Sequence, residues 1–182
     1  MAMPPTTPSP ISSSRCSTRI IGRGLLTSDA ELWREQRRIV AERTPRLRLF
    51  WMESLRLYPP VPRFDRQAIG SDILGGADVG PGDIVSIWPW LLQRHRKLWD
   101  QPDAFIADRF AEKGGRHRFQ YLPFGAGPRT CVGAQFATAE ALTVLAHWLS
   151  EWRFVEAGHD VRAAGMVTLR PKGGLPLILE RR

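Results

Sequence analysis

One cysteine in this sequence lies where a thiolate could bind a metal ion. Residues 124–133 read FGAGPRTCVG and place Cys131 near the end of a glycine-rich stretch. Gly125 and Gly127 can take the positive-φ backbone of a sharp turn, and Pro128 restricts the backbone between them and the thiol. The second cysteine, Cys16, is too distant to suggest a disulfide framework or a zinc site. We therefore expect a single sulfur ligand on a bent loop.

A helix is predicted directly after this loop, at about 133–150. Apolar residues with helical spacing share one face of it: Ala137, Ala141, Val144, Leu145 and Trp148. The free N–H groups and the positive dipole end of such a helix point at the sulfur and favour the thiolate. Arg129 lies two residues before Cys131, so the site suits an iron held in a macrocycle that carries acidic groups. The alternative is a buried cysteine that acts as a small hydrophobic residue.

Two further pairs of residues have a spacing that would place both side chains on one face of a helix, where they could act together. Trp33 and Arg37 share a face of a helix predicted at 29–42, so an indole N–H and a guanidinium could reach one carboxylate. The alternative is a solvated basic face with one packed tryptophan. In a second helix, predicted at 47–57, Glu53 and Arg56 have the spacing of an intrahelical ion pair.

The elements that position these residues form an α+β chain, mostly helical, with small sheets. A sheet is predicted from residues 66–73 and 84–88, with a turn at Gly75-Gly76. Residues 167–169 and 175–179 are predicted to pair as a hairpin around residues 172–174, with Pro176 on an edge. Residues 1–18 are proline-rich and predicted to be a disordered leader before an ordered part at 19–182.

Composition limits the possible functions. The chain has 182 residues, of which 43% are hydrophobic and 24% charged, and these values are typical of a globular protein. The net charge of +8 raises nucleic-acid binding as an alternative, but the arginines are scattered, so we expect no nucleic-acid partner. No apolar stretch is long enough for a membrane span, so a cytoplasmic protein without membrane contact is expected.

The loop Phe124-x-x-Gly127-x-Arg129-x-Cys131-x-Gly133 resembles the haem-binding loop of the cytochrome P450 superfamily. Trp33-x-x-x-Arg37 is similar to the helix of that family that holds a haem propionate, and Glu53-x-x-Arg56 is similar to its Glu-x-x-Arg helix. In the family a second arginine joins that pair, and residues 102–110 supply Arg109 as its candidate.

The resemblance implies haem b, bound through Cys131 as the iron ligand, with propionates held by Trp33, Arg37 and Arg129. The full set of implied cofactor-binding residues is Trp33, Arg37, Phe124, Gly125, Arg129, Cys131, Gly133 and Ala137. The resemblance also implies a monooxygenase that inserts oxygen into a small hydrophobic organic substrate. Its electrons would come from a ferredoxin or a flavoprotein reductase.

The chain is far shorter than complete members of that family. The resemblance implies a propionate-binding segment at 19–43 and a C-terminal haem-binding part at 44–182, joined almost directly at Thr44-Pro45. We therefore expect a partial cytochrome P450 fold that lacks the central distal helices, and we assign no catalytic residue. A non-catalytic haem-binding remnant, a misjoined gene product and a basic nucleic-acid-binding protein remain as alternatives.

Overall fold

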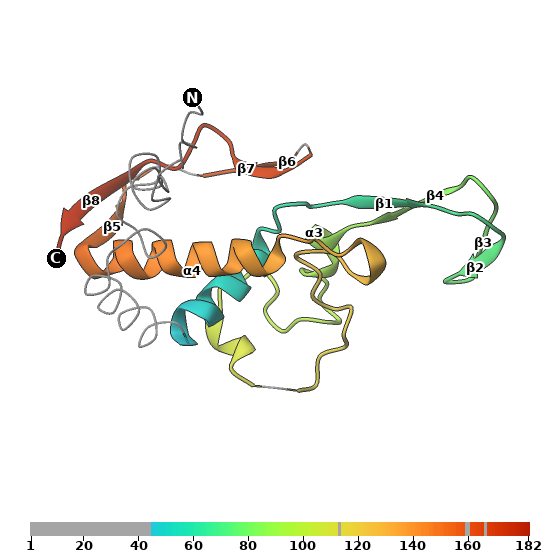
Figure 1. Cartoon of the computed structure of the whole chain (residues 1–182), viewed down its shortest axis with the longest axis horizontal. Coiled ribbons are helices and arrows are strands. Elements are labelled where there is room, and N and C mark those ends of the chain that lie inside the picture. Colours follow the sequence, from blue (N-terminus) through green and yellow to red (C-terminus); the bar gives the residue numbers. More distant parts are fainter. Residues whose placement is uncertain (1–44, 113, 159–160, 166) are drawn as a thin grey trace, which may run out of the picture.

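The computed structural model describes residues 45–112, 114–158, 161–165 and 167–182. Two helices dominate it: one over residues 45–57, and α4 at Ala134–Glu151 (Figure 1). Both were predicted: the first ends at the predicted residue 57, and α4 agrees with the predicted 133–150 to within one residue at each end. The predicted helix at 29–42 and the predicted leader lie outside the described residues. Shorter helical elements are α3 at Pro89–Leu92 and the 3-10 turns η1 at Ala107–Phe110 and η2 at Gly127–Arg129.

Within the part of the chain that the structure describes, the strands form four separate antiparallel pairs. β1 (Phe64–Gln67) pairs with β4 (Ile84–Ile87), and β2 (Asp72–Leu74) pairs with β3 (Ala77–Val79). Together they make a narrow ribbon that extends away from the helices (Figure 1). The predicted turn at Gly75-Gly76 is present, and both glycines have positive φ angles, 61° and 86°. This part of the sheet prediction is confirmed.

The C-terminal strands pair differently from the prediction. β7 (Leu169–Pro171) pairs with β6 (Ala163–Gly165), while β8 (Leu177–Arg181) pairs with β5 (Trp152–Glu156). The predicted hairpin around residues 172–174 is therefore wrong. Pro171 lacks an N–H group, so a ladder between β7 and β8 would lose one donor in β7. The observed β5–β8 pairing joins five residues with five.

The core lies where helix 45–57, residues 99–122 and α4 meet. Its buried apolar side chains are Leu55, Leu57, Trp99, Phe110, Leu122, Leu142 and Ala146. Within α4 the buried positions are Leu142 and Ala146, whereas Val144 and Trp148 of the predicted face are exposed. Apolar residues occur around much of this helix, so periodicity alone did not select the buried side. No helix within the described ranges is both long and apolar enough to cross a bilayer.

Candidate functional site

The loop before α4 is closed by its own backbone hydrogen bonds. Gly125 and Gly127 both have φ angles of 73°, in the left-handed region that favours glycine. The N–H and the hydroxyl of Thr130 donate to the Gly127 carbonyl at 3.0 and 2.8 Å. The Cys131 N–H donates to the Phe124 carbonyl at 2.9 Å. These bonds fix the backbone that leads into Cys131.

The thiol of Cys131 is exposed at the N-terminal end of α4. Gly133 is the residue before the helix, and a Cβ added there would lie 3.9 Å from the Cys131 sulfur. The glycine therefore leaves open the space beside the sulfur. Val132 and Phe136 are also exposed, at 102% and 66%. An exposed sulfur with apolar neighbours can ligate a metal and contact a flat apolar group at the same time.

The structure brings six of the eight predicted cofactor-binding residues together. Phe124, Gly125 and Arg129 lie in the loop with Cys131, and Gly133 and Ala137 lie at the start of α4. The Arg129 side chain is exposed, as its predicted role requires. Trp33 and Arg37 lie outside the described residues. Their roles, like the assignment of the other six to a cofactor, stay predictions.

A buried ion pair lies within helix 45–57. Glu53 and Arg56 are both fully buried, and two parallel bonds join them: Nε to Oε2 and Nη2 to Oε1, each 2.8 Å. Arg56 Nη1 also donates to the carbonyls of Gln93 and Pro102, at 2.8 and 2.7 Å. Because all of these groups find partners, the buried charge of Arg56 is compensated.

Arg109 joins the pair, as predicted from the family resemblance. Its Nε donates to Glu53 Oε1 at 3.0 Å, and the backbone N–H of Ile106 donates to the same oxygen at 2.9 Å. Burial alone would raise the pKa of Glu53, but the hydrogen bonds from Arg56, Ile106 and Arg109 outweigh it and lower that pKa. Glu53 therefore remains a carboxylate inside the core.

Gln93 connects this ion pair to the cysteine loop, and sequence reasoning missed it. Its side chain is fully buried, and Nε2 donates to the carbonyls of Leu55 and Arg56, each at 3.0 Å. Its Oε1 accepts from the backbone N–H of Leu122 at 2.7 Å, two residues before Phe124. The only local signal is a polar residue directly after the apolar run at Pro89–Leu92.

Comparison with known proteins gives consistent matches. The family model described as Cytochrome P450 matches residues 42–175. The chain is similar to cytochrome P450 4c3 of Drosophila melanogaster, 38% identical over 68% of this chain and 24% of that protein. It is also similar to cytochrome P450 4V2 of Mus musculus, 37% identical over 71% of this chain and 26% of that protein.

The solved structures give the same result. The crystal structure of the cytochrome P450DA heme domain superposes with a TM-score of 0.68 and 28% identity, over 72% of this chain and 30% of that chain. The chain spans about a quarter of the length of the curated relatives it matches.

Proposed function

Because this chain belongs to the cytochrome P450 family, we propose that it binds haem through the Cys131 thiolate as the haem-binding part of a monooxygenase. The reaction class is insertion of an oxygen atom into a small hydrophobic organic substrate. The observation that carries the proposal is the exposed Cys131 thiol, held at the N-terminal end of α4 by a hydrogen-bonded loop.

Family membership confirms three predictions made from the sequence. It confirms the resemblance itself, the partial α+β fold of that family, and haem with its iron as the cofactor. The residues present fit this group: a soft sulfur ligand, an open space at Gly133, and exposed apolar side chains at Val132 and Phe136. When bound, haem supplies the redox chemistry that activates dioxygen.

The residues of this chain have separate tasks in the proposal. Cys131 would ligate the iron from its position at the N-terminal end of α4. Arg129 would donate to an acidic group of the cofactor, and Trp33 and Arg37 would have the same role. Glu53, Arg56 and Arg109 bond to one another and to backbone groups of Gln93, Pro102 and Ile106, so their task is to hold these segments together.

Ferredoxin or a flavoprotein is the proposed electron donor. The net charge of +8 supports this choice, because a basic protein attracts acidic electron-transfer partners. A second candidate is a haem-binding protein without turnover. The exposure of Val132 and Phe136 supports this candidate, because an uncovered site admits water. The cytoplasmic location and the absence of membrane and nucleic-acid partners stay predictions.

The test is haem uptake by the purified full-length chain. Supplied with hemin, reduced and exposed to carbon monoxide, the chain should show the strongly red-shifted Soret band of a thiolate ligand. Cys131→Ala should abolish this band, and Cys16→Ala, the matched control, should keep it. A wild-type chain without the band, or a band that survives in Cys131→Ala, would contradict the proposal.

Product formation separates the two candidates. The loaded chain is supplied with a reductase, a ferredoxin and a panel of small hydrophobic compounds. Oxygenated product that depends on Cys131 supports the monooxygenase. A chain that gives the red-shifted band but forms no product supports the second candidate.

A further inference from the structure

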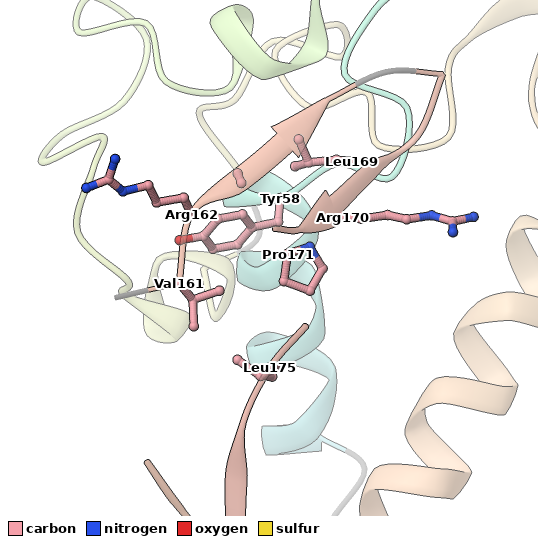
Figure 2. Close-up of a pocket in the computed structure, with 8 residues that line it drawn as sticks. Tyr58, Val161, Arg162, Leu169, Arg170, Pro171 and Leu175 are labelled. Carbon is pink, nitrogen blue, oxygen red and sulfur yellow. The ribbon is translucent and has the colours of Figure 1, made fainter. Parts of the chain in front are cut away.

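The C-terminal end of helix 45–57 needs hydrogen-bond donors from outside the helix. Carbonyl groups in the last turn of a helix have no partner within it. The N–H of Tyr58 donates to the Ser54 carbonyl at 2.7 Å. The ring of Tyr58 lies in a cavity beside the β6–β7 hairpin (Figure 2). The carbonyls of Leu55 and Arg56 therefore depend on donors from another segment.

The side-chain amide of Gln93 supplies both donors and, at its other end, an acceptor. Nε2 donates to the carbonyls of Leu55 and Arg56, each at 3.0 Å, and Oε1 accepts from the Leu122 N–H at 2.7 Å. The side chain is fully buried. The orientation of the amide is fixed, because the reverse orientation would set its oxygen against two carbonyls and its NH₂ group against an N–H.

The backbone of Gln93 is held as firmly as its side chain. Its N–H donates to the Pro89 carbonyl at 2.9 Å, and its carbonyl accepts from Arg56 Nη1 at 2.8 Å. Arg56 and Gln93 thus bond to each other in both directions: the carbonyl of each accepts from the side chain of the other. Gln93 is therefore a rigid anchor for any group that it binds.

The group that Gln93 binds leads directly to the sulfur. The Leu122 carbonyl accepts from the Gly125 N–H at 3.2 Å, and the Phe124 carbonyl accepts from the Cys131 N–H at 2.9 Å. Among the described residues, Gln93 is the only one outside the loop whose side chain bonds to the backbone between positions 121 and 131. A shift of Leu122 would move the Phe124 carbonyl, two residues later, and with it the N–H of Cys131.

We propose that Gln93 is a positioning residue for Cys131. Its amide joins the end of helix 45–57 to the start of the cysteine loop and so holds the sulfur in place. Gln93 acts through Leu122 and Phe124, in the way that outer residues orient the ligands of a metal. The consequence for haem affinity rests on the proposed function, whereas the effect on the loop does not.

Few side chains can take the place of Gln93. The position requires a donor toward the helix and an acceptor toward the loop. A neutral imidazole offers one of each, whereas methionine has the length of glutamine but no strong donor or acceptor. Gln93→Met should therefore release the loop, and Gln93→His should keep it in place.

Amide hydrogen exchange of the full-length chain without haem tests the effect on the loop. Mass spectrometry of peptides that cover residues 120–133 follows the exchange. In Gln93→Met these peptides should exchange about 2- to 12-fold faster, as expected for one lost hydrogen bond, and Gln93→His should stay close to the wild type. Leu57→Ala removes a buried apolar side chain without a bond to the loop. It should not raise exchange in these peptides more than elsewhere in the core.

A haem titration tests the effect on the iron site. Gln93→Met should weaken haem binding about 10- to 100-fold, as expected for the loss of an outer residue that orients a metal ligand. A smaller share of its reduced carbon monoxide complex should show the red-shifted band. Gln93→His should restore both. The matched control is Gln67→Met, because the Gln67 amide donates to the Gly82 carbonyl in the ribbon, at 3.2 Å, and should not affect haem binding.

Equal exchange of residues 120–133 in Gln93→Met and the wild type would overturn the proposal, whether or not haem binds. Faster exchange with unchanged haem affinity, or a Gln93→His chain that behaves like Gln93→Met, would overturn it as well. A wild-type chain that takes up no haem would instead refute the proposed function, and the exchange measurement would still decide whether Gln93 holds the loop.

Discussion

At the scale of single residues, the carboxylate of Glu53 is a buried charge with several hydrogen-bond donors around it. Its two oxygens accept four hydrogen bonds, from Arg56, Arg109 and the Ile106 backbone, and its side chain is fully buried. A pair of this kind adds little net stability compared with an apolar pair, but removing one partner leaves the other charged and alone in the core. The cost of breaking the pair is therefore much larger than its net contribution.

Glu53→Gln tests this expectation. Glutamine keeps the size of the side chain but removes its charge, so the buried guanidinium of Arg56 loses its counter-ion. We expect the free energy of unfolding to fall by about 3–5 kcal/mol, measured by urea denaturation followed by circular dichroism.

The control for this measurement is Glu140→Gln on the exposed side of α4, which should change the unfolding free energy by less than about 0.5 kcal/mol. A similar loss of unfolding free energy in the two variants would show that the charge of Glu53 is not needed to compensate the buried charge of Arg56.

At the scale of elements, the cysteine loop depends on backbone conformation. Gly127 has a φ of 73°, and a Cβ added there would meet no atom within 4 Å. Any effect of a side chain at this position is therefore conformational and not steric. The hydrogen bonds from Thr130 to the Gly127 carbonyl need this conformation, so it should govern how well the thiol is held.

Gly127→Ala should destabilise the chain by about 1–2 kcal/mol, the cost of a left-handed conformation for a residue with a Cβ. Urea denaturation measures this loss, and a haem titration should show weaker uptake. Gly70→Ala is the matched control: an added Cβ there also meets nothing, and Gly70 has no positive φ. Equal effects of the two substitutions would refute the conformational explanation.

The sequence predicted elements and pairs wherever the signal is local. The loop around Cys131, both described long helices and the Gly75-Gly76 turn follow from short patterns of glycine, proline and apolar residues. The contact of Arg109 with Glu53 was predicted only through the family resemblance, because 56 positions separate the two residues.

One failure is local: the strand predicted at residues 66–73 is interrupted at 68–71. The other failures concern contacts between distant segments. The Gln93 side chain bonds to backbone groups 29 to 38 positions away, and no sequence pattern near Gln93 predicts these bonds. The partner of β8 is β5 and not its neighbour β7, because strand pairing depends on competing ladders across the chain. Likewise, the side of α4 that is buried depends on which elements pack against the helix, and local periodicity does not show this.

At the scale of the whole molecule, the pKa of Glu53 links stability to pH. That pKa is lowered from its ordinary value of 4.5, so just below pH 4.5 the unfolded chain binds a proton that the folded chain does not. The stability contributed by the Glu53 carboxylate is therefore fully present above pH 4.5. It is lost as the pH falls through the lowered value.

Urea denaturation of the wild type and Glu53→Gln at a series of pH values from 6 to 3 tests this linkage. The difference in unfolding free energy between the two chains should be constant above about pH 4.5 and should shrink below it. Other carboxylates, such as Asp65, titrate equally in both chains and cancel from the difference. A difference that stays constant down to pH 3 would contradict the lowered pKa.

The ion pair and Gln93 also determine when the chain can finish folding. Their bonds, with that of the Tyr121 hydroxyl to the Met52 carbonyl, join positions 37, 56 and 69 residues apart, while the strands pair only two by two. Closing such long loops costs entropy before any of the bonds forms. We therefore expect the native centre to assemble late and cooperatively, and the loop that presents Cys131 to reach its final shape only when that step is complete.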